Sequence, residues 1–187
     1  MSKVLVPLAN GFEEIEAVTI IDVLRRAEID VLIGALKAQP YVAGAHKMFL
    51  QTDCLVEKVT ADMIDMIVLP GGWGGTLALA EDENVQKLLK DMDAKGKEIG
   101  AICAAPLALH KAGVLKQNYT CYPSVEEEIR TNGFVGDKAM VVEDGNVMTS
   151  RGPATAMCFA LAIVKKLKGI EVYNSVKNGL LANYCEE

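Results

Sequence analysis

The sequence lacks segments that would anchor the chain in a membrane or direct it to export. Its longest apolar run, residues 99–109, is far shorter than the roughly 18 residues that a membrane-spanning helix requires. The amino-terminal MSKVLVPLANGFEE has acidic residues directly after a short apolar run and no cleavage site. We therefore expect neither a signal peptide nor a membrane partner.

Clustered basic residues are also missing. Lysine and arginine number 19 against 25 aspartates and glutamates, which gives a formal net charge of −6. Proteins that hold nucleic acid stably do so through basic patches that neutralise phosphates. The composition therefore argues against nucleic acid as a stable partner.

Metal-binding patterns are scarce as well. The chain has only two histidines, and its five cysteines never form a Cys-x-x-Cys pair. A structural zinc site is improbable on these counts, and we expect no metal. Well-separated cysteines in odd number predict reduced thiols in a cytoplasmic protein, with Cys158 in the core beside Met157 and Phe159, and Cys185 near the terminus.

What the sequence does contain is an alternation of short apolar runs and helical patterns. Helical spacing of apolar residues separates the runs and continues to about residue 167, and a last helix is predicted over roughly Glu171–Asn178. Such alternation predicts an α/β fold with a doubly wound parallel sheet, and without linkers or repeats we expect a single domain over residues 1–187. The predicted strands are Lys3–Leu8, Asp30–Leu36, one or two short strands within Tyr41–Val59, Asp65–Leu69, Glu98–Ile102, Tyr119–Tyr122, Ala139–Glu143 and Asn146–Thr149.

Unusual chemistry follows three of the predicted strands. The segments are Asn10–Glu16, Pro70–Gly75 and Ala101–Ala105. In open parallel sheets, ligand sites form outside the carboxyl ends of the strands. We therefore expect these loops to meet at one edge and to form one site.

Cys103 lies where a buried strand passes into a helix, which is the setting of a nucleophile elbow. Such turns are crowded and strained, and the small neighbours Ala101, Ala104 and Ala105 suit them. The amino end of the next helix would stabilise the thiolate and lower the pKa of the thiol. The alternative is that Cys103 is a small buried apolar residue.

The glycine-rich PGGWGG after the third strand could suggest phosphate binding. Its spacing does not match G-x-G-x-x-G, because Leu77 stands where the third glycine should be, and no Gly-Lys-Ser/Thr follows. Gly71 and Gly72 could instead bring backbone N–H groups to a reacting oxygen, together with the N–H of Ala104. The alternative is a plain turn.

Glu16 differs from its acidic neighbours because it is surrounded by apolar residues. Glu13 and Glu14 fit a solvated first helical turn. A carboxyl group in a partly apolar pocket tends to stay protonated, and a protonated Glu16 could donate a hydrogen bond to a thiolate. The alternative is one more exposed helix acid.

Four motifs, GFEEIEAV, IVLPGG, GAICAAP and TSRGPATA, occur in this order from Lys3 to about Lys177. Together they resemble the ThiJ/PfpI family, in the branch of the parkinsonism-associated protein and its bacterial relatives. The resemblance implies a flavodoxin-like three-layer sandwich with a mostly parallel central sheet, usually a homodimer, without metal or organic cofactor. It also implies roles for eight residues: Cys103 as reactive nucleophile, Glu16 as its protonated partner and proton relay, Gly72 and Ala104 as oxyanion-hole donors, and Gly71, Tyr122, Arg151 and Pro153 as pocket residues.

The chain departs from that pattern at Tyr122, where many family members have a histidine. His110 lies about 10 Å further along the predicted helix from Cys103, and His46 falls in a stretch of mixed pattern. Peptidase chemistry needs a group that takes the thiol proton and later protonates a leaving amine. Peptidase or amidase activity is thus disfavoured, and Glu16 would have to carry proton transfer.

The resemblance implies cysteine-dependent detoxification of reactive carbonyls. The expected reactions are conversion of methylglyoxal to lactate without glutathione, as in glyoxalase III, and deglycation of early glyoxal adducts on proteins and nucleotides. Both would serve protection against oxidative stress. The alternative is a redox sensor or chaperone that works through oxidation of Cys103.

Overall fold

A seven-stranded sheet forms the centre of the computed structural model, which describes residues 2–185. The strand order is β5–β2–β1–β6–β7–β9–β8, and only β8 runs antiparallel to its neighbour. The strands are β1 (Lys3–Leu8), β2 (Asp30–Ala35), β5 (Cys54–Leu55), β6 (Met66–Leu69), β7 (Glu98–Ile102), β8 (Val141–Asp144) and β9 (Val147–Ser150). A separate antiparallel hairpin pairs β3 (Tyr41–Ala43) with β4 (Phe49–Gln51).

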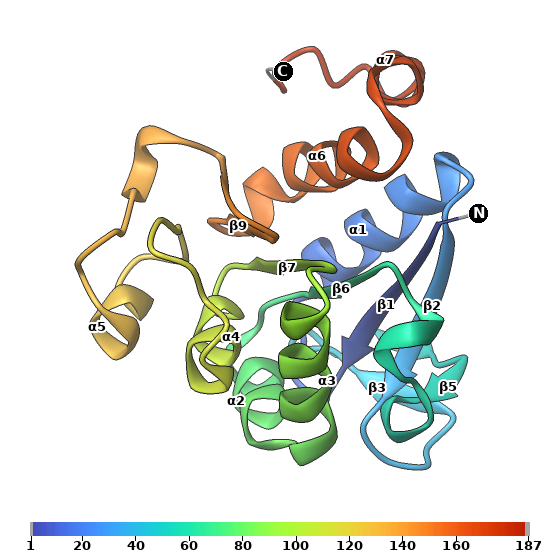
Figure 1. Cartoon of the computed structure of the whole chain (residues 1–187). Coiled ribbons are helices and arrows are strands. Elements are labelled where there is room, and N and C mark those ends of the chain that lie inside the picture. The colour runs from blue at the N-terminus through green and yellow to red at the C-terminus, as the bar shows by residue number, and fades with distance from the viewer. Residues whose placement is uncertain (1, 186–187) are drawn as a thin grey trace.

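Helices cover both faces of this sheet, as Figure 1 shows. The first layer comprises α1 (Glu14–Arg26), α6 (Ala156–Lys168) and α7 (Ile170–Gly179). The second comprises α2 (Trp73–Glu81), α3 (Glu83–Ala94) and α4 (Pro106–Ala112), with the short α5 (Val125–Ile129) beside α4. Short 3₁₀ turns lie at Val56–Lys58, Ala61–Met63, Gly136–Lys138 and Pro153–Thr155. The predicted α/β class and the flavodoxin-like sandwich with a mostly parallel sheet are confirmed.

The apolar runs of the sequence fill two cores, one on each side of the sheet. Alternate residues of β1 point in opposite directions, so that Val4 and Val6 join the core under α1 and α6 while Leu5 joins the core under α3. All four residues of β6 are buried, as expected for a parallel strand covered on both faces. Because β6 is a central strand, the loop that follows it begins among the carboxyl ends of the neighbouring parallel strands.

Two local predictions differ from the structure. Tyr119–Tyr122 forms no strand; Tyr119 makes one isolated bridge to Phe134, and the Thr120 N–H donates to the side chain of Thr149 at 3.0 Å. The Thr149 side chain on β9 therefore accepts the backbone N–H that would otherwise pair with a neighbouring strand. In addition, helix α2 begins directly after Gly72, where the glycines indicated only a loop.

The expectation of reduced thiols is wrong for one pair. Cys158 and Cys185 form a disulfide, whereas Cys54, Cys103 and Cys121 are free. Cys158 is buried as expected, in the first turn of α6. Because α7 follows α6 after a glycine, the chain reverses and brings the carboxyl-terminal segment back to that turn (Figure 1).

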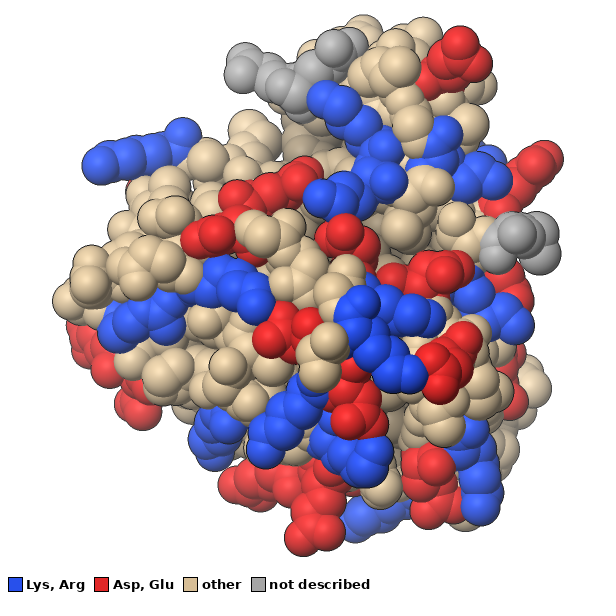
Figure 2. All heavy atoms as spheres, in the orientation of Figure 1, with Lys and Arg blue, Asp and Glu red and all other residues tan. Residues whose placement is uncertain are grey.

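The surface agrees with the charge pattern of the sequence. Lysine and arginine are interspersed with aspartate and glutamate over the face seen in Figure 2, rather than gathered in one basic patch. Among residues 2–185, no helix is long and apolar enough to cross a membrane.

Candidate active site

Cys103 occupies a strained turn at the end of β7. Its φ angle is +64°, a left-handed conformation that residues with a side chain rarely adopt. Backbone hydrogen bonds hold the turn on both sides, because the Cys103 N–H donates to Ser150 O at 3.0 Å and its carbonyl accepts from Tyr122 N at 2.8 Å. This is the geometry expected of a nucleophile elbow.

Glu16 projects from α1 to the same point and has no exposed surface. Its Oε2 accepts a hydrogen bond from the Gly71 N–H at 2.7 Å. Its other oxygen, Oε1, is buried and has no well-aligned donor among residues 2–185, and the carboxyl group as a whole lies within interaction distance of the Cys103 thiol. Glu16 is therefore a buried acid paired with the cysteine, and the alternative of an exposed helix acid is excluded.

Burial dominates the ionisation of this pair. It raises the pKa of the Glu16 carboxyl to about 7, although hydrogen bonds from Gly71 and Cys103 act in the opposite direction. Burial and the neighbouring Glu16 raise the pKa of the Cys103 thiol to about 12, against the effect of the Gly72 and Ala104 N–H groups. Near neutral pH the two groups thus lose one proton between them.

The expected lowering of the Cys103 pKa is therefore wrong. Helix α4 begins only at Pro106, so its first turn lies beyond the sulfur. Desolvation beside a carboxyl group outweighs two backbone N–H donors. A thiolate at Cys103 forms most readily when the thiol proton passes to Glu16 rather than to water.

The glycines after β6 have steric reasons to be glycines. Gly72 has a φ of +86°, and a Cβ on it would lie 2.3 Å from the carbonyl oxygen of Gly11. A Cβ on Gly71 would lie 2.6 Å from Cβ of Cys103 and 2.7 Å from Oε2 of Glu16. The close approach brings the Gly72 N–H to the Cys103 sulfur, where the Ala104 N–H also points.

A cavity of about 580 Å³ opens over Cys103. Two of the predicted pocket residues, Tyr122 and Pro153, line it. Gly71 lies behind the sulfur instead, and Arg151 lines a neighbouring hollow, where its Nε pairs with Asp137 at 2.9 Å. The lining residues that the sequence did not single out are Trp73, Ser124, Val125 and the carboxylates Glu13, Glu127 and Glu128.

Neither histidine lines this cavity. His46 belongs to the turn of the β3–β4 hairpin, and its Nδ1 lies 3.0 Å from Oε2 of Glu14. Glu14 is buried, contrary to the solvated position expected for it, because it also accepts the backbone N–H groups of His46 and Met48. This residue joins α1 to the hairpin, a contact between segments that are distant in the sequence.

The same corner holds possible metal ligands. Glu13, Glu14 and His46 bring three ligand atoms within 4.8 Å of one another. Both oxygens of Glu14 already accept hydrogen bonds, however, and His46 is largely exposed. These residues form a structural contact between α1 and the β3–β4 hairpin.

Comparison with known proteins identifies the family to which this chain belongs. The family model described as DJ-1/PfpI matches residues 2–166. The chain belongs to the DJ-1/PfpI family. As a DJ-1/PfpI protein, it is 42% identical to the Drosophila melanogaster protein DJ-1beta over 98% of this chain and 100% of that protein. The crystal structure of DJ-1beta superposes with a TM-score of 0.92, covering 97% of this chain and 98% of that one.

Two further relatives of this DJ-1/PfpI protein carry names that state an activity. A Caenorhabditis elegans protein named glutathione-independent glyoxalase DJR-1.2 is 37% identical over 88% of this chain and 87% of its own length. A Pyrococcus abyssi protein named a deglycase is 31% identical over 89% of this chain and 99% of its own length.

Proposed function

We propose that this DJ-1/PfpI protein is a cysteine-dependent enzyme that detoxifies reactive carbonyls, as a glutathione-independent glyoxalase, a deglycase of early glyoxal adducts, or both. The observation that carries the proposal is the juxtaposition of Cys103, Glu16 and two backbone N–H groups beneath an open cavity. The names of the nematode and archaeal relatives support the same chemistry.

The reaction starts with attack of the Cys103 sulfur on the aldehyde carbon of methylglyoxal. Glu16 accepts the thiol proton as the carbon–sulfur bond forms, because its pKa of about 7 lets it act as either base or acid near neutral pH. The N–H groups of Gly72 and Ala104 are close enough to the sulfur to stabilise the developing alkoxide. Glu16 then gives the thiol proton to this alkoxide, so that the product is a neutral hemithioacetal and the Glu16 carboxylate is free to act as a base.

Glu16 then moves a proton between the adjacent carbons. It removes the proton from the carbon bonded to sulfur and returns it to the neighbouring carbon, while the hydroxyl proton on the first carbon's oxygen passes to the oxygen of the second carbon. These two proton shifts convert the hemithioacetal into a thioester of lactate. Hydrolysis of the thioester consumes one water, releases lactate and restores the thiol. With no histidine at the cavity, Glu16 performs each transfer alone, and turnover should be slow.

For the deglycase reaction, the rim of the cavity favours adducts on proteins over adducts on nucleotides. Glu13, Glu127 and Glu128 line the opening, and no lysine or arginine does so among residues 2–185. Carboxylates repel the phosphates of a glycated nucleotide. A glycated peptide should therefore be deglycated faster than a glycated nucleotide, and the reverse order would refute this assignment.

The test of the proposal is lactate formation from methylglyoxal without glutathione. Wild type should form lactate catalytically, Cys103→Ala should form none, and Glu16→Gln should be slowed by roughly 10²-fold or more, because glutamine cannot relay a proton. Cys54→Ala, which removes a free thiol outside the cavity, should match wild type. Equal lactate formation by Cys103→Ala would overturn the assignment.

A second candidate is a redox sensor or chaperone, favoured by the buried acid that could hold an oxidised Cys103 by a hydrogen bond. It predicts stoichiometric aldehyde loss without lactate, and a mass gain of two oxygens at Cys103 after mild peroxide. A peptidase or amidase remains disfavoured, because no histidine among residues 2–185 lines the cavity.

Homodimer formation and a cytoplasmic location remain predictions. Light scattering that gives the mass of a single 20.1 kDa chain at micromolar concentration would refute the dimer. The cytoplasmic prediction rested on reduced thiols, and only Cys54, Cys103 and Cys121 now support it.

A further inference from the structure

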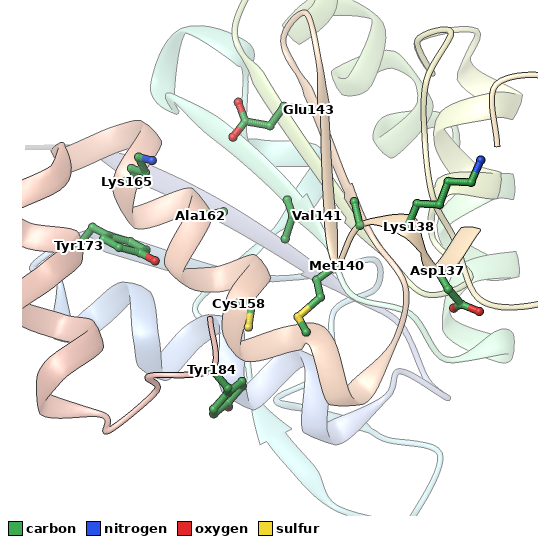
Figure 3. Close-up of a pocket in the computed structure, with 11 residues that line it drawn as sticks. Asp137, Lys138, Met140, Val141, Glu143, Cys158, Ala162, Lys165, Tyr173 and Tyr184 are labelled. Atoms are coloured by element: carbon green, nitrogen blue, oxygen red, sulfur yellow. The ribbon is translucent and has the colours of Figure 1, made fainter. Parts of the chain in front are cut away.

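The Cys158–Cys185 disulfide lies at the wall of a second cavity, distinct from the one over Cys103. This cavity has a volume of about 610 Å³ and lies between α6, β8 and the carboxyl-terminal segment. Figure 3 shows Cys158 facing the space beside Met140, with Tyr184 from the terminal segment below it. A molecule in the cavity therefore meets a disulfide sulfur.

The two sulfurs differ in accessibility. Cys158 is 7% exposed and lines the cavity, whereas Cys185 is 1% exposed and does not line it. Thiol–disulfide exchange requires a thiolate to approach one sulfur directly, so access determines which sulfur is attacked. The geometry directs attack to Cys158.

The charges around the cavity indicate what kind of molecule it suits. Of its two acids, Asp137 is paired with Arg151 and Glu143 with Lys166. Its two lysines, Lys138 and Lys165, form no ion pair with a residue in the range 2–185, and Figure 3 shows them on opposite sides of Cys158. The unneutralised charge of the lining is thus positive on both sides of the disulfide.

We propose that this cavity is a binding and modification site for a small thiol that carries carboxylates, of the kind found in thiol-containing peptides. Lys138 and Lys165 would attract the carboxylates, and the thiol would reach the sulfur of Cys158. The space is large enough for a molecule of a few amino acids, since ligand cavities of roughly 300–1,000 Å³ hold compounds of that size.

The chemical step is an exchange without any further reactant. The thiolate of the ligand attacks Sγ of Cys158, a new sulfur–sulfur bond forms, and the Cys158–Cys185 bond breaks. The electron pair leaves with Cys185, which becomes a thiolate and takes up a proton. The product is a mixed disulfide on Cys158 and a carboxyl-terminal segment that is no longer tied to α6.

The rate of this exchange tests the charge requirement. Glutathione, the neutral 2-mercaptoethanol and the cationic cysteamine would each be mixed with the oxidised protein, and loss of the disulfide followed by alkylation and mass spectrometry. Rates on the urea-unfolded protein correct for the intrinsic reactivity of each thiol. After this correction glutathione should be fastest and cysteamine slowest, and equal corrected rates would overturn the proposal.

Lysine variants sharpen the comparison. Lys138→Gln and Lys165→Gln should each slow the exchange with glutathione by roughly two- to fivefold, the range expected for loss of an exposed ion pair. The rate of exchange with 2-mercaptoethanol should not change. Lys111 is exposed on α4, in the helical layer on the opposite face of the sheet from this cavity. Lys111→Gln removes the same charge and should change the rate of neither glutathione nor 2-mercaptoethanol. Equal slowing of both thiols by the cavity variants would contradict binding through the carboxylates.

Peptide mapping tests which sulfur is attacked. A reduced thiol reacts with a disulfide but not with a free thiol, so the three free cysteines take up no glutathione in this experiment. After a brief reaction and acid quench, glutathione should be found on Cys158 and the alkylating label on Cys185. Glutathione mainly on Cys185, or five titratable thiols in the protein after mild oxidation, would refute the proposal.

Discussion

Replacing Glu16 by glutamine should make the protein more stable at neutral and alkaline pH. The pKa of Glu16 is about 7 in the folded protein against an ordinary value of 4.5. The folded state therefore holds this proton more tightly than the unfolded state does. Stability contributed by the protonated carboxyl is complete below pH 4.5, declines between pH 4.5 and 7, and is lost above pH 7.

The size of the effect follows from the two pKa values. Each pH unit between them is worth about 1.4 kcal/mol, so ionising Glu16 costs about 3 kcal/mol of unfolding free energy at pH 8. Glutamine has nearly the same shape, carries no charge, and keeps an oxygen that can accept from the Gly71 N–H. We expect Glu16→Gln to be more stable than wild type by up to this amount at pH 8, or roughly 6–12 °C in melting temperature.

The assay is urea unfolding followed by far-UV circular dichroism at pH values from 4.5 to 8. The quantity of interest is the difference between wild type and variant, because Glu14, His46 and other titrating groups are common to both. Glu81→Gln, which removes an exposed carboxyl at the end of α2, is the matched control. Its free energy of unfolding should change with pH in the same way as that of wild type. If the free energy of unfolding of Glu16→Gln also follows that of wild type across this pH range, burial does not raise the pKa of Glu16.

Three other outcomes are expected. Cys158→Ser opens the loop closed by a disulfide with a sequence separation of 27, which should cost about 3.5 kcal/mol on the chain-entropy estimate; an unchanged melting temperature, or an equal loss in Cys54→Ser, would contradict it. Gly72→Ala places a Cβ 2.3 Å from a backbone oxygen at a positive φ, so alkylation of Cys103 by iodoacetamide should slow markedly, and a wild-type rate would show that this loop does not shape the site. The same alkylation should rise with pH around a midpoint near 7 in wild type, because ionised Glu16 can accept the thiol proton, and should lose this rise in Glu16→Gln; a single midpoint above pH 9 in both proteins would exclude the shared proton.

Much of the fold and the outline of the active site follow from the sequence alone. Near-continuous apolar runs such as Asp65–Leu69 are typical of strands covered on both faces, and parallel strands of one sheet have their carboxyl ends along the same side of that sheet. The strand-to-turn passage at Cys103 and the glycines at 71 and 72 are local patterns with local steric causes. They could be interpreted without knowing what lies opposite them.

The remaining features depend on contacts between distant parts of the chain, which no local pattern contains. Glu14 is buried because a hairpin more than 30 residues away supplies its hydrogen-bond donors, and Cys158 meets Cys185 because α7 reverses the chain. The direction of the Cys103 pKa shift was misjudged for the same reason. A helix start and a nearby acid can be seen in the sequence, but desolvation depends on everything packed around the sulfur, and only the tertiary structure determines it.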